Sequence, residues 1–425
     1  MNIQSLAKSN TFVNLLGFGV VSICGVLINL LVAKNYEVAV VGLFSYFYSL
    51  LIICSQFSTF GLHYSALKYL SEDDIDLDKK LTSGLAIAIV SGIFCLFIFL
   101  GFAYFFSKLP RSTEYLICAA VGILIFSINK YFLFCLNGLH WLRAFAVFNT
   151  LRYVFSIVWL LLGTYFLSIE QVDLFLCSLV LIPELVLLVV LIFKLSKYIH
   201  FGRISFPYVK NYFVFGFKGM WTGALTEVNT KVDVLFITHF LGAGSAGIYS
   251  IPTMIFEGAS QLPSVFRNIL NPKISRLYRL NDLMELKRQI VISAKMSLIF
   301  VPVLCVVSGA LFPIYVRYFV GIEAYMDGWA STIILLSGMI LSAALLPVQM
   351  FLIQTGEPGK QSLFLFAAVL LNIVLNVALV PSMGVAGAAL ATAITTVASS
   401  LLNFFIVRSK INQREKLLFA GVSSV

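Results

Sequence analysis

The chain has 425 residues, of which 60% are hydrophobic and only 11% are charged. Soluble domains usually carry about 25% charged residues, so this composition excludes an ordinary soluble protein and indicates an integral membrane protein. The 29 lysine and arginine residues outnumber the 19 acidic residues. These cations stand in short connections between apolar runs, which indicates orientation in a membrane and not a nucleic-acid partner.

Apolar runs of about 20 residues, long enough to cross a bilayer as helices, recur along the chain and predict about twelve membrane spans. The first run exceeds the apolar core of a signal peptide, which has about 7 to 15 residues, so we expect it to remain as a membrane helix. The expected fold is an all-α polytopic membrane protein. The predicted spans are 12–33, 41–62, 81–106, 115–137, 144–167, 172–193, 213–240, 246–266, 290–312, 329–353, 361–380 and 385–407.

The distribution of lysine and arginine predicts the orientation of these spans. The two ends of the chain and the even-numbered connections carry about 20 of these residues, whereas the odd-numbered connections carry about four. The four are Lys34, Lys108, Arg111 and Arg317. Cytoplasmic loops are enriched in lysine and arginine, so both termini are expected to be cytoplasmic.

Two pairs of similar short segments, here called sequence echoes, predict that the halves of the chain are repeats. Val41-Gly42-Leu43-Phe44-Ser45 recurs as Ala246-Gly247-Ile248-Tyr249-Ser250, and Leu136-Asn137-Gly138 recurs as Gln354-Thr355-Gly356. Repeats of six spans each have the same orientation, so they are parallel repeats about an axis along the membrane normal. The predicted halves are residues 1–205 and 206–425, with a binding site expected between them.

The seventh predicted span contains three charged residues, Glu227, Lys231 and Asp233. A charge at the centre of a membrane helix costs about 3 kcal/mol or more, so it usually faces a partner or a polar cavity. Glu227 and Lys231 are four residues apart and share a helix face, where they can neutralise each other. The alternative is that Lys231 binds an anion while Glu227 or Asp233 takes up a proton or a cation.

Four further charges lie inside predicted spans: Lys130, Arg152, Glu184 and Glu257. The guanidinium of Arg152 matches phosphate oxygens in a bidentate fork, which makes it a candidate anion ligand. Lys130 is a second candidate, although it can also extend to the cytoplasmic interface. Glu184 follows Pro183, and one interpretation is that it only accommodates the helix break. Glu257 is a candidate member of the same cavity.

Motifs for nucleotide, metal and disulfide chemistry are missing from the sequence. It has no Gly-x-x-x-x-Gly-Lys-Ser/Thr loop for phosphate and no His-Glu-x-x-His pair for zinc. The seven cysteines all lie in apolar runs without Cys-x-x-Cys spacing, and we interpret them as small buried hydrophobes. We therefore expect no catalytic residue, metal site or cofactor.

Two stretches resemble signatures of a known superfamily. The first is Lys231-Val-Asp233-Val-Leu-Phe-Ile followed by Leu241-Gly242 and Ala246-Gly247-Ile248-Tyr249-Ser250. The second runs from Asn372 to Thr392 and contains Asn376, Pro381, Gly384 and Gly387. Both resemble the multidrug/oligosaccharidyl-lipid/polysaccharide (MOP) flippase superfamily, and length and composition are most similar to the bacterial O-antigen flippases, the Wzx group. The resemblance implies a MATE-like V-shaped bundle of two six-helix halves.

The resemblance also implies a function in polysaccharide and lipopolysaccharide biosynthesis. The substrate would be an undecaprenyl-pyrophosphate-linked oligosaccharide, moved by alternating access from the cytoplasmic to the periplasmic leaflet of the bacterial inner membrane. Such transport would be driven by H⁺ or Na⁺, and the implied partners include membrane lipids, a polysaccharide polymerase and chain-length proteins. The candidate anion ligands are Arg152, Lys231 and Lys130, and the candidate ion-coupling residues are Asp233, Glu227 and Glu257.

Two alternatives from other functional classes remain open. A MATE-like antiporter of cationic drugs shares the twelve-span layout, but its cavities are usually acidic, and Arg152 and Lys231 favour an anionic substrate. A membrane polysaccharide polymerase or ligase usually carries a large periplasmic loop. The longest outward connection here, residues 313–328, is short for an enzyme site. We therefore expect a transporter and not an enzyme.

Overall fold

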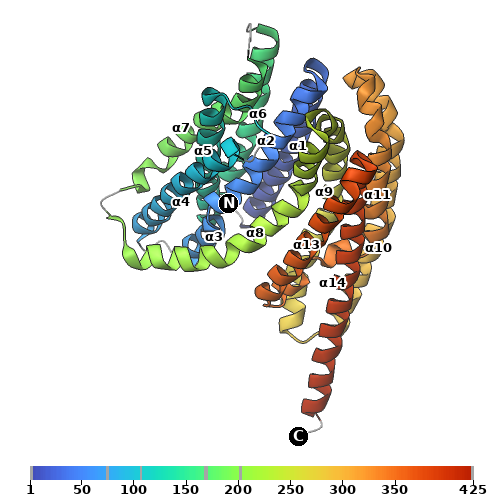
Figure 1. Ribbon diagram of the computed structural model, residues 1–425. Helices are drawn as coiled ribbons and strands as arrows, with labels where there is room; N and C mark the ends of the chain where they lie inside the picture. The colour runs from blue at the N-terminus through green and yellow to red at the C-terminus, as the bar shows by residue number, and fades with distance from the viewer. Residues whose placement is uncertain (1–2, 73–75, 106–107, 167–170, 201–202, 423–425) are drawn as a thin grey trace. The chain divides into compact units, whose positions relative to one another are not determined.

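The computed structural model describes residues 3–72, 76–105, 108–166, 171–200 and 203–422 (Figure 1). Within these ranges the chain is helical and contains no β-strand. Each of the twelve predicted spans lies wholly or for the most part within one helix. The predicted ends at residues 106 and 167 lie outside the described ranges. The all-α polytopic fold class is confirmed. By its contacts the chain divides into two compact units, Met1–His239 and Phe240–Val425.

The first unit is built around α5, which packs against α2, α3, α4, α6 and α7. One apolar cluster gathers fully buried side chains from α3, α4, α5, α7 and α8, among them Leu81, Tyr131 and Leu187. The helices of this unit are α1 (Ile3–Asn35), α2 (Val38–Ser58), α3 (Leu62–Glu72), α4 (Leu77–Phe105), α5 (Thr113–Gly138), α6 (Leu142–Phe166), α7 (Val172–Leu195), η1 (Ser196–Tyr198) and most of α8 (Phe206–Leu241).

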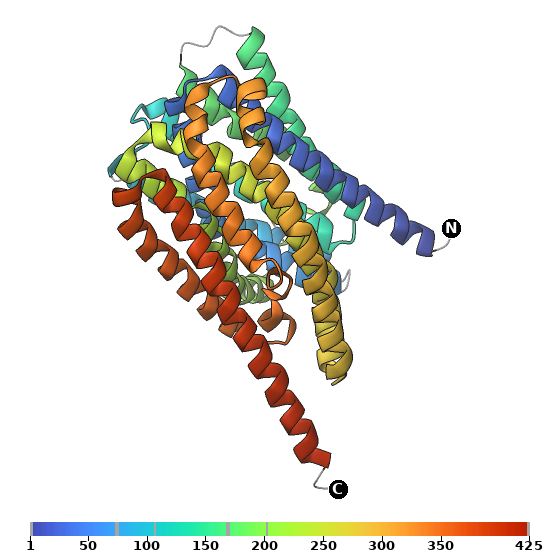
Figure 2. The ribbon, with the colours of Figure 1, turned by 90° about the vertical axis from the view of Figure 1, so that its right-hand side faces the viewer.

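The second unit packs α14 against α11 and α13, and α9 against α10. In both views α14 continues as a single rod beyond the other helices of its unit, toward the C-terminus (Figures 1 and 2). Its helices are α9 (Ala243–Arg279), α10 (Leu283–Ile314), η3 (Tyr315–Val320), η4 (Glu323–Gly328), α11 (Trp329–Ser342), η5 (Leu346–Val348), α12 (Phe351–Gln354), α13 (Pro358–Met383) and α14 (Val385–Val422).

Nine helices of the described part of the chain are long and apolar enough to cross a membrane. Large apolar side chains cover their outer faces, and Val90, Phe94 and Phe97 of α4 are more than 60% exposed. Such faces are stable against lipid and not against water. The three remaining spans correspond to α1, whose apolar part is Gly19–Asn35, and to α8 and α9, whose charged and polar residues reduce their hydropathy.

Two predicted spans have different ends from those expected. The span predicted at 329–353 is broken: α11 ends at Ser342, and the chain continues through the turn η5 into the short helix α12. Pro347 lies in this turn and has no N–H to donate to a continuing helix. The span predicted at 41–62 ends four residues early, at Ser58, because Phe60 and Gly61 have positive φ angles of 48° and 67°. The separate helix α3 begins directly after them.

The two sequence echoes fall at comparable places in the structure. Gly42 is the fifth residue of α2, and Gly247 is the fifth residue of α9. The helices α5 and α12 end with the same Schellman motif, in which the N–H groups of Trp141 and Glu357 donate to carbonyl groups five residues earlier. The left-handed positions are His140 and Gly356, so the structural match is shifted by two residues from the sequence echo. The boundary between repeats at residue 205 stays a prediction.

A small ionic cluster joins α13 to α14 outside the apolar spans. Glu357 forms an ion pair with Lys410 and a second one, at 3.2 Å, with Lys360. The hydrogen bond from Lys410 holds the pKa of Glu357 below its usual value. A carboxylate whose folded-state pKa is depressed stabilises the protein above its unfolded pKa of about 4.3, and this stabilisation disappears as the pH falls through the folded-state pKa.

We therefore expect the Glu357→Gln variant to unfold at a lower temperature than the wild type near neutral pH, with a gap that shrinks as the pH falls below about 4.5. Thermal unfolding in detergent across this pH range measures the gap. Glu323→Gln, on η4, is the matched control because this exposed carboxylate has no ion pair among those found in the described residues. A gap for Glu357→Gln that is unchanged in acid would contradict the argument.

Candidate functional site

A buried ion pair between α6 and α7 is the best-defined charged contact inside the membrane spans. Arg152 Nε lies 2.5 Å from Glu184 Oε1, and Arg152 Nη2 donates to Glu184 Oε2 at 3.3 Å. The side chains are 12% and 2% exposed. Glu184 also accepts a hydrogen bond of 2.7 Å from the Asn129 amide of α5, and the Arg152 guanidinium lies 4.5 Å from the ring centroid of Phe126. Burying the carboxylate is tolerated because two neighbouring side chains, Arg152 and Asn129, satisfy it.

Pro183 shapes α7 next to this pair. Proline has no N–H, so the main-chain carbonyl of Leu179, four residues earlier, loses its helical partner. The Ser156 hydroxyl of α6 lies 3.4 Å from that carbonyl, but its shorter hydrogen bond, of 3.0 Å, goes to the main-chain carbonyl of Arg152 in its own helix. Asn129 donates 2.7 Å to the main-chain carbonyl of Glu184. The structure therefore replaces one sequence interpretation: Glu184 does not only accommodate the break at Pro183 but forms the ion pair with Arg152.

Lys130 connects this pair to α8. It follows Asn129 on α5, is half-buried, and is close enough to Glu227 and Arg152 for direct electrostatic interaction. The Gln56 amide of α2 donates to Glu227 Oε1 at 3.4 Å. The structure thus brings together three predicted site residues, Lys130, Arg152 and Glu227, within the first unit.

Glycines on α8 let aromatic and polar side chains approach Glu227 closely. A Cβ atom on Gly219 would lie 2.7 Å from the ring of Tyr64, and one on Gly223 would lie 3.0 Å from Gln56 Oε1. Tyr64 interacts electrostatically with Glu227. Small residues spaced three to four apart on one face allow such close helix contacts in membranes.

His63 is a further polar member of the cluster. It is 4% exposed, its ring lies 4.1 Å from that of Tyr64, and it interacts electrostatically with Lys130. Its Nδ1 atom has no hydrogen-bond partner among the described residues. Because buried polar atoms are nearly always paired, this nitrogen is available to a ligand or a water molecule.

The remaining predicted site residues are Lys231, Asp233 and Glu257. Lys231 is half-buried and Asp233 is 4% exposed, both on α8 beyond Glu227. Glu257 belongs to the second unit, where it is half-buried on α9 and its main-chain carbonyl accepts a bond of 2.7 Å from Ser260. The joint cavity predicted for Glu227, Asp233 and Glu257 therefore stays a prediction.

Sequence reasoning missed Gln56, His63, Tyr64 and Asn129. A signal for two of them was present, because Gln56 and the Asn129-Lys130 pair are polar residues inside otherwise apolar runs. His63 and Tyr64 gave no such signal, since they stand at the end of a span where polar and aromatic residues are common. Only the turn at Gly61, which starts α3 and faces α8, makes them part of the cluster.

Chemically, the cluster combines two cations, Lys130 and Arg152, and two carboxylates, Glu184 and Glu227, with amide, imidazole and phenol groups. A guanidinium carries five N–H donors, and the contacts to Glu184 use two nitrogens of Arg152, so further donors can reach an anion. Lys130 adds a mobile ammonium group. These groups lie between the middle and the predicted cytoplasmic end of their spans.

Comparison with solved structures shows the fold to be that of transporters. A MATE family transporter of the MOP superfamily in an inward-facing conformation is 13% identical, with a TM-score of 0.78, covering 93% of this chain and 96% of the other. An outward-facing MATE transporter gives 14% identity and a TM-score of 0.66, with 96% of both chains covered. A MOP superfamily transporter from Pyrococcus furiosus, described as having a binding pocket of reverse polarity, gives 13% identity and a TM-score of 0.62, with 95% of both chains covered.

The apolar helices define a multi-pass membrane protein, and its fold is that of MOP superfamily transporters. The family model described as polysaccharide biosynthesis protein matches residues 7–278, which is more than half of the chain. The chain therefore belongs to this family of polysaccharide biosynthesis proteins within the MOP flippases, as the sequence signatures predicted. No curated protein matches it.

Proposed function

We propose that the protein moves an undecaprenyl-pyrophosphate-linked oligosaccharide, of the O-antigen type, from the cytoplasmic to the periplasmic leaflet of the bacterial inner membrane. The proposal depends mainly on one observation: Lys130 and Arg152, on two membrane helices of the first unit, are close enough to interact electrostatically. A pyrophosphate cannot leave water without cationic partners, because an unpaired buried charge is prohibitively costly. Membership of the polysaccharide biosynthesis family supports the same substrate class.

Lys130 and Arg152 are assigned to the pyrophosphate, with Lys231 as a further cation on α8. Gln56 and Tyr64 can supply hydrogen bonds to the sugars nearest the phosphate. Glu227 and Asp233, and Glu257 in the second unit, are proposed to take up H⁺ or Na⁺ and couple transport to an ion gradient. The proposed transport mechanism is alternating access, and both termini are proposed to be cytoplasmic.

The test is a flipping assay in liposomes with a fluorescent lipid-linked oligosaccharide. We expect Lys130→Ala to slow flipping about tenfold, because a hydrogen bond to a charged group contributes about 1.5–3 kcal/mol and 1.4 kcal/mol is a factor of ten. Lys130→Arg keeps the charge and should retain more activity. Lys197→Ala removes an exposed cation after α7 and serves as the control with unchanged flipping.

The fold similarity to MATE transporters makes export of cationic drugs the second candidate function. Efflux of a cationic dye from cells and from liposomes distinguishes the two functions. Dye export that Asp233→Asn abolishes, together with no flipping of lipid-linked glycan by the wild type, would overturn the proposed function. Flipping that depends on Lys130 without dye export supports it.

A further inference from the structure

The last part of α14 carries more charged side chains than its contacts with the second unit account for. Between residues 408 and 416 it has five charged side chains. Three of them have partners in the second unit: Lys410 binds Glu357, Glu415 binds Lys287 at 2.6 Å, and Arg414 donates to Asn281 at 2.8 Å. The remaining two, Arg408 and Lys416, line an open pocket on the helix surface.

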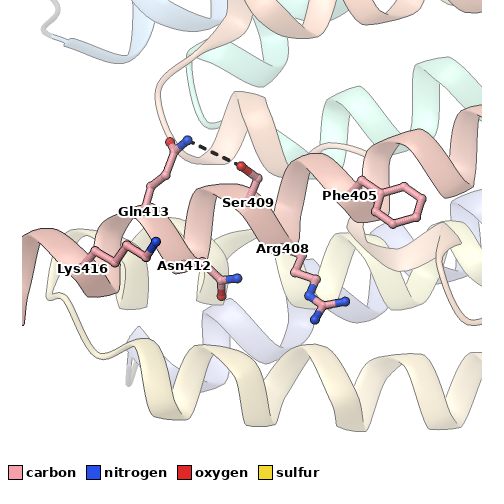
Figure 3. Close-up of a pocket in the computed structure, with 6 residues that line it drawn as sticks. All are labelled: Phe405, Arg408, Ser409, Asn412, Gln413 and Lys416. Carbon is pink, nitrogen blue, oxygen red and sulfur yellow. Dashed lines mark hydrogen bonds between the residues drawn. The ribbon is translucent and has the colours of Figure 1, made fainter.

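This pocket follows one face of α14 (Figure 3). The opposite face is buried, with Val407 and Ile411 in an apolar cluster that includes Leu270 and Phe351. Gln413 donates to Ser409 within the pocket at 3.5 Å. The lining comprises two cations, three groups that form neutral hydrogen bonds and one aromatic ring, without an acidic residue: Phe405, Arg408, Ser409, Asn412, Gln413 and Lys416.

Basic residues at the end of a membrane helix commonly serve as interfacial anchors, and this role accounts for Arg408, the first residue after the predicted span. It does not account for Lys416. A helix rises 1.5 Å per residue, so Lys416 lies about 12 Å further along α14, beyond the depth at which an anchor acts. Nor does anchoring explain the hydroxyl and amide groups between the two cations.

The order of groups along the pocket matches a lipid-linked glycan. Phe405, which is 60% exposed, lies on the membrane side of Arg408. Ser409, Asn412 and Gln413 follow on the water side. An isoprenoid tail, a pyrophosphate and sugar hydroxyls occur in the same order along such a lipid. A phosphoglycerol lipid ends soon after its phosphate and would leave the amides and Lys416 unused.

We propose that this face of α14 binds the headgroup of the lipid-linked oligosaccharide in the cytoplasmic leaflet, before the lipid enters the helices of the first unit. Arg408 binds the pyrophosphate, Asn412 and Gln413 bind the sugars closest to it, and Lys416 binds the outer sugars. The inference rests on the proposed function and on the predicted cytoplasmic position of the C-terminus.

Binding to the full-length protein in phosphatidylcholine nanodiscs tests this inference with three probes: lipid-linked oligosaccharide, undecaprenyl pyrophosphate and phosphatidylglycerol. We expect Arg408→Ala with Lys416→Ala to weaken binding of the first probe about tenfold and of phosphatidylglycerol less than twofold. Asn412→Ala with Gln413→Ala should weaken binding of the oligosaccharide lipid and leave undecaprenyl pyrophosphate unchanged. Arg276→Ala with Arg279→Ala removes the same charge from exposed positions of α9 and should change nothing.

Equal weakening for all three probes would assign the pocket to anionic lipids in general and overturn the inference. So would unchanged binding of the oligosaccharide lipid in both pocket variants while the wild type flips it normally. In that case the proposed function stands, because it depends on Lys130 and Arg152. A wild-type protein that neither binds nor flips the oligosaccharide lipid would overturn the proposed function and this inference together.

Discussion

The Arg152→Ala variant is expected to lose at least tenfold in flipping rate and to be less stable than the wild type by about 3–5 kcal/mol. Two effects combine in this variant. One cation is removed from the proposed pyrophosphate site, and Glu184, which is 2% exposed, is left without its ion-pair partner. Flipping in liposomes and thermal unfolding in detergent measure the two effects separately.

The double variant Arg152→Met with Glu184→Leu separates transport from stability. Replacing a buried ion pair with apolar residues of similar size is often neutral or stabilising, and Asn129 can still donate to the main-chain carbonyl at position 184. We expect stability to recover and flipping to remain low. Arg111→Ala, an exposed arginine outside the spans, controls for loss of one charge. Normal flipping by the double variant would show that the pair only supports the fold.

Among the substitutions of one glycine by alanine, Gly61→Ala is expected to reduce stability the most, by about 3 kcal/mol or more. Gly61 has a φ of +67°, and an added Cβ would lie 2.8 Å from the Gly216 carbonyl carbon and 2.9 Å from the Met220 nitrogen. Because both contacts are with the backbone of α8, no side-chain rotation can relieve them. Thermal unfolding and protease resistance in detergent measure the loss.

Gly321→Ala isolates the contribution of the close contact. Gly321 has a similar φ of +79°, but no atom lies within 4 Å of the position that its Cβ would occupy. A left-handed alanine alone costs about 1–2 kcal/mol, so this variant should be destabilised only moderately. If the two alanine variants unfold at the same temperature, the contact between Gly61 and α8 does not determine the position of that helix.

The helices could be predicted from sequence because a bilayer imposes a length on each apolar run. The predicted helix ends were wrong where an apolar run does not form one continuous helix. The run at 329–353 is mostly apolar and has no charged residue, yet Pro347 and the turn η5 interrupt it. The end of α2 at Ser58 was missed for a different reason, since the positive φ angle at Phe60 is a conformation that a phenylalanine adopts only in a particular tertiary setting.

The candidate site was predicted residue by residue but not as a set of contacts. Lys130, Arg152 and Glu227 stand out because each charge is unusual in its span. Their partners do not, because Arg152 and Glu184 are 32 residues apart on different helices, and no local rule pairs them. The contact between Glu227 and Gln56, 171 residues away, likewise follows from no local rule, and pairing of Glu227 with Lys231 along its own helix stays a prediction.

The polar character of α8 has a consequence for how the protein is made. Transfer of each charged residue to the centre of a bilayer costs about 2.5–3.5 kcal/mol on the insertion scale, and α8 carries Glu227, Lys231 and Asp233 near its middle. Its residence in the membrane therefore depends on contacts with earlier helices, such as Gln56 on α2. For this segment, membrane insertion during synthesis and tertiary folding should be a single step, which requires the helices of the first unit to be in the bilayer when α8 leaves the ribosome.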